Sequence, residues 1–304
     1  MSSTSGVHHV AIGVKNLETM KSFYRDILGF TEVFAEFDES EQEIMREVVR
    51  AFRVILGGVM LRHKEGGILL ELIRVTEPVP RPIRKDFRYG DIGVAKITVA
   101  VSNLVEVYER LKNKVDFFSE PKVAVISGWG EYPFVYCKDP EGNLVELISM
   151  AKTEKKSLLK GLCSIGISVT DLERTISFYR EHLGFDTVVI KQHEAFSGLV
   201  NDITHCEGTK IRSCLISTDS NMEGMVELFE VCNPRGRSIP FSTIWGDFGY
   251  LQIAFSCDDI HGMVSRLESA GMEFLCSPKI KDEGEFVYAK DTDGIPIEFL
   301  FLPK

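Results

Sequence analysis

The chain has 304 residues, of which 44% are hydrophobic and 26% charged, proportions typical of a soluble globular protein of about two domains. Its formal net charge of −10 disfavours nucleic acid and anionic membranes as partners. No run approaches the roughly 18 apolar residues of a membrane span, and Met1–Gly6 is polar, so we expect a cytoplasmic protein without a secretion signal. The seven cysteines are scattered without a CxxC pair, which indicates neither a disulfide framework nor a zinc knuckle.

Residues 6–30, GVHHVAIGVKNLETMKSFYRDILGF, predict an alternating strand followed by an amphipathic helix, whose apolar residues recur at steps of three and four. Asn16 is expected near the N-cap, and Gly29 where the helix ends in the left-handed conformation. Asp171 and Gly184 are expected to do the same for a second helix further along the chain. The acidic segment 37–52 is expected to form an amphipathic helix that covers one cavity of the fold. The remaining apolar runs predict strands, at Thr31–Phe34, Phe52–Leu61 and Ile68–Val75.

Residues 95–115 repeat this order of strand, turn residue and helix, and the runs Phe134–Lys138 and Leu144–Ile148 again predict strands. Each unit is therefore one strand, one helix and about three further strands. Trp129 lies between two glycines in SGWGEY, which predicts a hairpin turn, with a mobile lid as the alternative.

The second half of the chain repeats the first. Residues 161–185, GLCSIGISVTDLERTISFYREHLGF, match residues 6–30 without a gap, although Ser164 stands opposite His9. Three later stretches also match, at nearly the same offset: 66–75 with 223–231, 94–104 with 250–260, and 139–149 with 291–301. We therefore predict an α+β chain of four tandem βαβββ modules in two domains, 1–151 and 158–304, joined by the polar linker AKTEKKS.

Four glutamates lie inside apolar strand-like runs: Glu71 in ILLELI, Glu146 in LVELI, Glu227 in MVELF and Glu298 in IPIEFLF. A carboxylate buried in an apolar strand is costly unless a cation or hydrogen bonds compensate its charge. Each of the four therefore predicts a compensating partner in the fold.

This tandem of modules, with a histidine before an apolar strand, FYRDILGF closing the helix and DPEGNLVEL closing the unit, resembles the vicinal oxygen chelate superfamily. That superfamily includes glyoxalase I, methylmalonyl-CoA epimerase, extradiol dioxygenases and fosfomycin-resistance proteins. The resemblance covers essentially the whole chain. It implies that two modules curl into a cup-shaped, incomplete barrel, which binds a divalent metal through the first and last strand of each module. At those places stand, module by module, His9 and Glu71, Lys96 and Glu146, Ser164 and Glu227, and Gln252 and Glu298.

The resemblance leaves two ways to pair the modules. Neighbouring modules would give two cups, each with three usable ligands and one misfit. Pairing of the first module with the fourth, as in four-module glyoxalases, would gather one complete site, because imidazole, carboxylate and amide oxygen all bind divalent ions. In this arrangement the second site has lost its metal, which explains why Ser164 stands where the first half has His9. The arrangement predicts one divalent ion per chain. The sequence does not distinguish Zn, Mn, Ni, Co, Fe or Mg. The metal ligands of the complete site are His9, Glu71, Gln252 and Glu298.

The other two modules would then form a cup without metal. Lys96 binds metal only when deprotonated, and Ser164 is a poor ligand for most divalent ions. Lys96 is expected to neutralise Glu146 through a buried ion pair. The expected hydrogen-bond partner of the Glu227 carboxylate is Ser164 or a water molecule.

A metal in the complete site would keep about two positions for a substrate with adjacent oxygens, such as a hydroxy-ketone, a sugar-like compound or a thioester. The resemblance then implies a lyase, isomerase or epimerase in which Glu298 takes a proton next to the polarised carbonyl and Glu71 is its counterpart. One alternative is an extradiol dioxygenase, although that route needs two histidines and a glutamate where this chain has Ser164, Gln252 and Glu298. Another is a non-catalytic ligand-binding or resistance protein.

Basic residues lie close to the loops RYGDIG and WGDFG. They are solvated by default, but in an acidic protein they would equally steer an anionic substrate toward a cup. The expected partner is a small molecule, anionic if these side chains contact it, and the sequence leaves a homodimer open. The residues concerned are Arg81, Arg84, Lys85, Arg88, Arg235 and Arg237.

Overall fold

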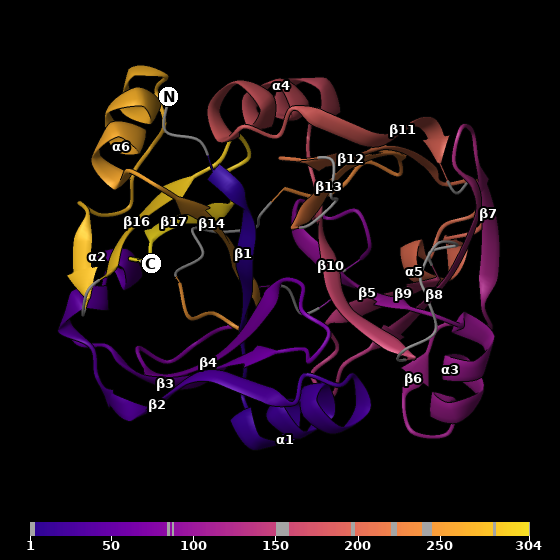
Figure 1. Ribbon diagram of the computed structural model, residues 1–304, viewed down its shortest axis with the longest axis horizontal. Coiled ribbons are helices and arrows are strands. Elements are labelled where there is room, and N and C mark those ends of the chain that lie inside the picture. Colours follow the sequence, from indigo (N-terminus) through magenta and orange to yellow (C-terminus); the bar gives the residue numbers. More distant parts are fainter. Residues whose placement is uncertain are drawn as a thin grey trace.

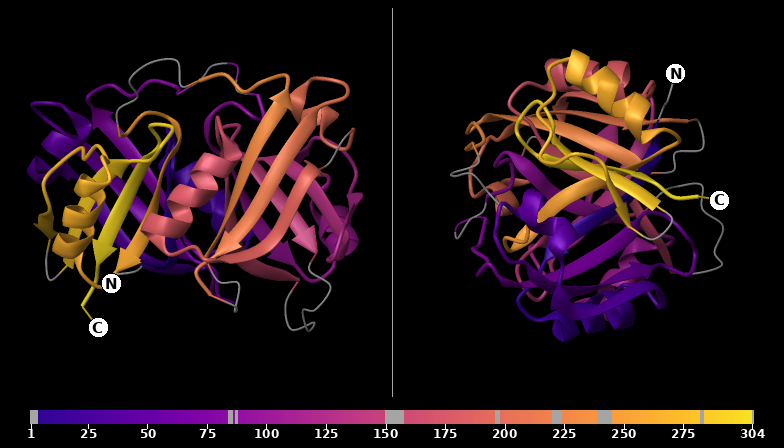
Figure 2. Two further views of the ribbon diagram at one scale, coloured as in Figure 1. Left: turned by 90° about the horizontal axis from the view of Figure 1, so that it is seen from above. Right: turned by 90° about the vertical axis from the view of Figure 1, so that its left-hand side faces the viewer.

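In the computed structural model, the strands form two strongly curled sheets that lie side by side, with helices on their outer faces (Figures 1 and 2). The predicted α+β class, with four modules that each begin with a strand and a helix, is confirmed. Within the described residues, no helix is long and apolar enough to cross a membrane. The predicted linker AKTEKKS lies outside the described residues, which are 4–83, 86, 88–149, 158–195, 198–219, 224–238, 245–281 and 284–303.

The first sheet has eight strands in the order β15-β16-β17-β14-β1-β4-β3-β2 and combines the first module with the fourth. We call its concave inner side the first cup. The first module supplies β1 (Thr4–Gly13), β2 (Glu32–Glu41), β3 (Ile55–Arg62) and β4 (Leu69–Glu77). The fourth supplies β14 (Gly249–Cys257), β15 (Lys279–Lys281), β16 (Gly284–Lys290) and β17 (Pro296–Phe301).

The second sheet combines the second module with the third, and its inner side is the second cup. Its strand order is β11-β12-β13-β10-β5-β9-β8-β6, with β7 paired to β8. The second module supplies β5 (Gly93–Val101), β6 (Asp116–Phe117), β7 (Lys122–Ile126), β8 (Gly130–Lys138) and β9 (Leu144–Ser149). The third supplies β10 (Leu159–Ser168), β11 (Thr187–Ala195), β12 (Lys210–Ser217) and β13 (Met225–Asn233).

At the centre of each sheet, two strands from opposite halves of the sequence pair with each other. β1 pairs antiparallel with β14, which sets Ala11 opposite Gln252, and β5 pairs in the same way with β10. The first module therefore joins the fourth, as the preferred pairing requires. The division into 1–151 and 158–304 stays a prediction about the sequence repeat, because each sheet takes one module from each half.

The main helices begin at a side chain that accepts a hydrogen bond from the backbone N–H three residues on, the N-cap arrangement that the sequence predicts for Asn16 and Asp171. α1 (Leu17–Ser22) continues as a π-helical turn, Phe23–Ile27. Gly29 and Gly184 have φ of 82° and 76°, so the predicted left-handed helix ends are confirmed. The other helices are α3 (Leu104–Leu111), α4 (Leu172–Leu183), α5 (Asn201–Thr204) and α6 (Ile260–Ser269).

The acidic segment 37–52 differs from its prediction as one amphipathic helix. Its first residues extend the edge strand β2 through Glu41, and only a 3₁₀ turn and the four-residue α2 (Arg46–Val49) are helical. An ion pair between Glu47 and Lys279, and a second one of 3.4 Å between Arg50 and Glu273, attach this segment to the fourth module. It therefore covers the rim of the first cup, as expected.

Candidate active site

Three side chains converge at the floor of the first cup. His9 lies in β1, Glu71 in the neighbouring parallel strand β4, and Glu298 in β17, beyond β14. His9 Nε2 is 3.4 Å from Glu71 Oε2 and 3.3 Å from Glu298 Oε2. The glutamates come from opposite halves of the sequence, so this arrangement depends on the pairing of the first module with the fourth.

The floor closes a cavity of about 260 Å³ whose walls are mainly apolar. The edge of β2 and the rim segment contribute one wall, including Phe34, Phe37 and Met45, and β16 contributes Phe286 on the other side. Lys281 and Glu285 are among the charged residues of the lining. The cavity is thus a pocket of small-molecule size with its polar groups gathered at one end, the usual form of a ligand site.

The floor is arranged to favour a positive charge. Desolvation alone would lower the pKa of His9, but the carboxylates of Glu298 and Glu71 raise this pKa to about 10. Burial, together with His9 and Arg62, lowers the pKa of His8 to about 3, so His8 is neutral. The Nδ1 atoms of His8 and His9 are 2.9 Å apart, so His9 donates there and directs Nε2 to the carboxylates. A proton on Nε2 or a bound metal ion would each supply the positive charge that the two carboxylates favour.

Gln252 lies behind this floor rather than in the cavity lining. Its Nε2 donates to Glu298 Oε2 at 2.7 Å and to the Tyr288 hydroxyl at 3.3 Å, while its Oε1 accepts from the Trp245 indole at 2.5 Å. Trp245 and Tyr288 were not among the expected site residues. The repeat could have indicated them, because it aligns Trp245 with Tyr89 and Tyr288 with Tyr136, which places an aromatic residue at both positions in each half.

The donors fit a divalent cation in type and spacing. Two atoms bound about 2.0–2.1 Å from a tetrahedral ion lie about 3.3 Å apart, close to the two distances that His9 makes with Glu71 and Glu298. His9 Nε2 is also buried without a hydrogen bond. In the part of the chain that the structure describes, no three His, Cys, Asp or Glu side chains are already arranged as a metal site.

The second cup holds an ammonium group in the corresponding place. Lys96 Nζ lies 2.5 Å from Glu146 Oε2 and 2.7 Å from Glu227 Oε2, and its side chain is 1% exposed. The predicted ion pair between Lys96 and Glu146 is present. The expectation that Ser164 or water serves Glu227 was wrong, because one ammonium has three donors and reaches both carboxylates.

Among its described residues, the second cup has little open space beside the ion pairs. The cavity beside Ser164 and Glu227 is about 30 Å³, enough for roughly one water molecule. Trp129 lines it from the hairpin turn between β7 and β8, so the predicted turn is confirmed. Gly166, which pairs with Lys96 across β10 and β5, makes room for the lysine stem, whereas the first half has Ala11 at this place.

Gly166→Ala is expected to destabilise the protein by about 1–3 kcal/mol, the usual cost of overpacking. A Cβ atom there would lie 2.6 Å from Lys96 Cγ and 2.7 Å from Lys96 Cε, and the ion pairs prevent the stem from moving aside. Urea unfolding measures the effect. If the urea midpoint and the slope of the unfolding transition were unchanged, the Lys96 side chain would be able to take another path past the added methyl group.

The described basic residues of these loops do not line the first cup. Arg81 pairs with Asp247 at 3.8 Å, and Arg237 pairs with Asp86 and Asp91 at 2.6 Å each. None of the described basic loop residues lines the first cavity, and Arg84 and Lys85 lie outside the described residues. These loop residues therefore give no support to the expectation of an anionic substrate.

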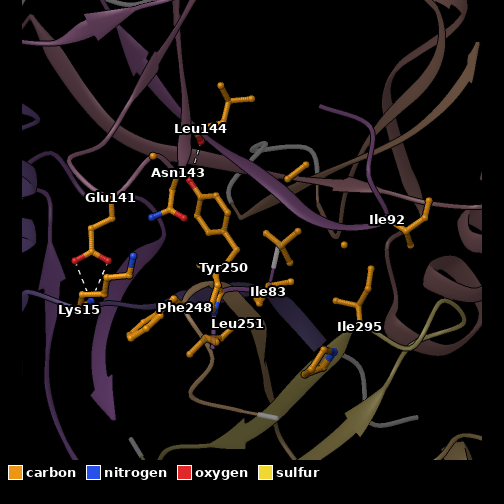
Figure 3. Close-up of a pocket in the computed structure, with 17 residues that line it drawn as sticks. Lys15, Ile83, Ile92, Glu141, Asn143, Leu144, Phe248, Tyr250, Leu251 and Ile295 are labelled. Atoms are coloured by element: carbon orange, nitrogen blue, oxygen red, sulfur yellow. Dashed lines mark hydrogen bonds between the residues drawn. The ribbon is translucent and has the colours of Figure 1, made fainter. Parts of the chain in front are cut away.

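Another cavity, of about 360 Å³, lies where the two sheets meet (Figure 3). Its labelled side chains are mostly apolar, and its polar groups are used within the fold. The Glu141 carboxylate accepts from the backbone N–H groups of Lys15 and Asn16, and the Tyr250 hydroxyl donates to the Leu144 carbonyl. Among the described residues of its lining, polar groups do not converge as they do around His9, so the first cup is the better candidate site.

Comparisons with known proteins agree with this architecture. A lactoylglutathione lyase of Schizosaccharomyces pombe is 23% identical over 316 residues, 98% of this chain and 97% of the yeast protein. Glyoxalase I from Zea mays has a TM-score of 0.67 at 17% identity, covering 99% of this chain and 92% of the maize chain. A putative dioxygenase from Bacillus subtilis has a TM-score of 0.60 at 13% identity, covering 100% and 87%.

These two structures support the fold alone. The sequence model of the Glyoxalase/Bleomycin resistance protein/Dioxygenase superfamily matches twice, over residues 6–147 and 161–299. These matches span most of the chain and reproduce the repeat read from the sequence. The chain therefore belongs to the glyoxalase/bleomycin resistance protein/dioxygenase superfamily.

Proposed function

We propose that the chain is a divalent-metal-dependent enzyme of the glyoxalase type, which moves a proton next to a carbonyl group of a small oxygenated substrate. The reaction class is a lyase, isomerase or epimerase, and hydroxy-ketones, sugar-like compounds and thioesters fit it. The observation that carries the proposal is the convergence of His9, Glu71 and Glu298 at the closed end of an apolar cavity. Similarity to a lactoylglutathione lyase along the whole chain supports the lyase class.

His9, Glu71 and Glu298 would hold the metal from the cavity floor. Gln252 would be the fourth ligand only after its amide turned, because its Nε2 and not its oxygen now faces Glu298. A bound divalent ion polarises a carbonyl group and so acidifies the neighbouring C–H. His9 already presents Nε2, the nitrogen that faces both carboxylates, because its Nδ1 is engaged by His8. The apolar walls would exclude water, which strengthens the charge interactions at the floor.

Glu298 would act as the base. His9 and Gln252 both contact its Oε2, so we assign proton transfer to Oε1. The proton would leave the carbon beside the carbonyl, bind Glu298, and return to the neighbouring position or to the opposite face of the same carbon. Glu71, on the other side of His9, would balance the charge as a ligand.

The dioxygenase alternative fits the floor less well. Non-haem iron oxygenases use two histidines and one carboxylate, whereas this floor has one histidine and two carboxylates. His8 is no second ligand here, because its Nδ1 contacts the Nδ1 of His9 instead of the floor.

The first prediction concerns stoichiometry: purified protein is expected to bind about one divalent ion per chain. His9→Ala should weaken binding at least about 10-fold, and Gln252→Ala should weaken it as well. Ser164→Ala, at the place equivalent to His9 in the second cup, is the matched control and should leave affinity unchanged. Calorimetric titration with Zn²⁺ measures all three. Two ions per chain, or loss of metal from Ser164→Ala, would contradict the single site.

The reaction class is tested by isotope exchange. Metal-loaded protein incubated with candidate hydroxy-ketones in deuterated water should replace the acidic C–H with C–D, which proton NMR detects as loss of signal. Metal-stripped protein is the control. Uptake of O₂ without exchange would favour the dioxygenase, and metal binding without either reaction would favour a ligand-binding protein.

A further inference from the structure

His8 and His9 both line the first cavity, although they are neighbours in one strand. The side chains of a regular strand alternate between its faces, so only one of the two would be expected there. A β-bulge explains the exception. In the pairing of β1 with β14, one step from Phe255 to Ala254 faces two steps in β1, so His8 is an extra residue. The bulge therefore brings a second imidazole to the cavity, beside the floor.

The contact between the two imidazoles determines which nitrogen of His8 carries a proton. Their Nδ1 atoms are 2.9 Å apart, so one of them donates and the other accepts. When Nε2 of His9 is a metal ligand at the floor, the proton of its ring is on Nδ1, which donates. Nδ1 of His8 then accepts, and a histidine that accepts at Nδ1 carries its proton on Nε2.

Nε2–H is the group that His8 can offer to a ligand. Within the part of the chain that the structure describes, His8 makes its hydrogen bond through Nδ1. Its half-buried ring lines the cavity and packs edge to face with Phe34, at 6.3 Å between ring centroids. The ring centroids of His8 and His9 are 5.2 Å apart, so a small molecule at the floor lies close to His8.

The second cup has the same bulge without the histidines. One step from Val99 to Thr98 in β5 faces two steps in β10, which makes Cys163 the extra residue there. Its thiol donates to the Thr98 carbonyl at 3.3 Å, and Cys163 is not among the described residues that line the small second cavity. The bulge therefore does not require His8, and the paired histidines occur in the cup with the larger cavity.

We propose that His8 is a substrate-binding residue of the first cup: its Nε2–H donates a hydrogen bond to an oxygen atom of the substrate. This role rests on the proposed function, because it requires an oxygenated substrate at the floor. It selects substrates that present an acceptor oxygen to His8, and it adds a contact that the metal ligands do not supply.

Binding of acetohydroxamate, a small chelator with two adjacent oxygens, to Zn²⁺-saturated protein tests this role by calorimetry. His8→Asn is expected to weaken this binding about 10- to 100-fold, the usual effect of losing a hydrogen bond to a charged group. Zn²⁺ affinity should stay unchanged, because asparagine still offers an acceptor oxygen to His9. His8→Gln has a longer side chain that again offers an N–H group to the cavity, so it should restore most of the acetohydroxamate affinity.

His205→Asn is the matched control, because His205 is exposed and asparagine tolerates its positive φ of 53°. It should change neither affinity. The donor role would be overturned by an acetohydroxamate affinity that is the same, or undetectable, in native and His8→Asn protein, or by failure of His8→Gln to restore it. These results would leave the metal site intact. A native chain that binds no Zn²⁺ would instead overturn the proposed function, and this role with it.

Discussion

Glu298→Gln is expected to lower kcat/KM by about 10²- to 10⁴-fold, the contribution usually made by a general base. An amide cannot take up the substrate proton. Glutamine has nearly the same shape as glutamate, and its oxygen can still accept from Gln252 Nε2, which lies 2.7 Å away in the native chain. The cavity should therefore keep its form while the chemistry is lost.

The deuterium exchange rate measures this effect, with bound metal determined in the same samples so that loss of the base is separated from loss of the ion. Glu285→Gln is the matched control, because Glu285 lines the same cavity and does not contact the floor residues. Full activity of Glu298→Gln at full metal occupancy would place the base elsewhere. If activity per bound metal falls further in Glu71→Gln than in Glu298→Gln, the two glutamates have exchanged roles.

Lys96→Met is expected to destabilise the protein by about 3–5 kcal/mol at neutral pH, the usual cost of breaking a buried ion pair from one side. The substitution keeps most of the stem volume and removes the charge that two buried carboxylates share. Desolvation, only partly offset by the ammonium, already raises the pKa of Glu227 in the native chain. Without Lys96 that offset is gone, and the pKa of Glu227 rises further.

The pH dependence has a definite sign. A carboxyl group whose pKa is higher in the folded than in the unfolded chain binds its proton more tightly when folded, so it adds stability as the pH falls. The stability lost in Lys96→Met should therefore recover partly as the pH falls toward the ordinary pKa of a free carboxyl group. In the native chain burial by itself would lower the pKa of Lys96, but the carboxylates of Glu146 and Glu227 raise this pKa well above its usual range, so the contribution of Lys96 is lost only in strong alkali.

Urea unfolding at several pH values measures both effects. Lys112→Met is the matched control, because Lys112 pairs with Glu109 at 2.5 Å but both side chains are largely exposed, 41% and 56%. Its loss should leave the stability nearly unchanged, because exposed ion pairs contribute little. A Lys96→Met protein as stable as the native chain would show that the second cup does not need its internal cation.

The floor residues could be predicted because their signals are local. Burying a carboxylate within an apolar run, as in ILLELI or IPIEFLF, costs much free energy unless a cation lies nearby. The repeat also places Glu71 and Glu298 at the same position of their modules. The helix caps at Asn16 and Asp171 were likewise readable, because a cap depends on a few adjacent residues.

Other features depend on residues that meet only in the folded chain. The sequence does not reveal that one ammonium serves both Glu146 and Glu227, because those glutamates lie in different halves of the chain. It does not reveal the bond from Trp245 to Gln252 either, since an indole in a loop gives no sign of which strand residue it will reach. The segment 37–52 was mistaken for one helix because an exposed edge strand and an exposed helix can carry the same acidic residues.

By itself, the sequence determined the modules, their repeat, and the positions along each strand that carry His9, Glu71, Gln252 and Glu298, because strand alternation and the cost of a buried charge act within a few residues. Only the tertiary structure decided which modules share a sheet. Strand pairing depends on contacts between residues far apart in the sequence, and in the structure β1 pairs with β14 while β5 pairs with β10. That choice placed two carboxylates beside an imidazole in one cup and beside an ammonium in the other.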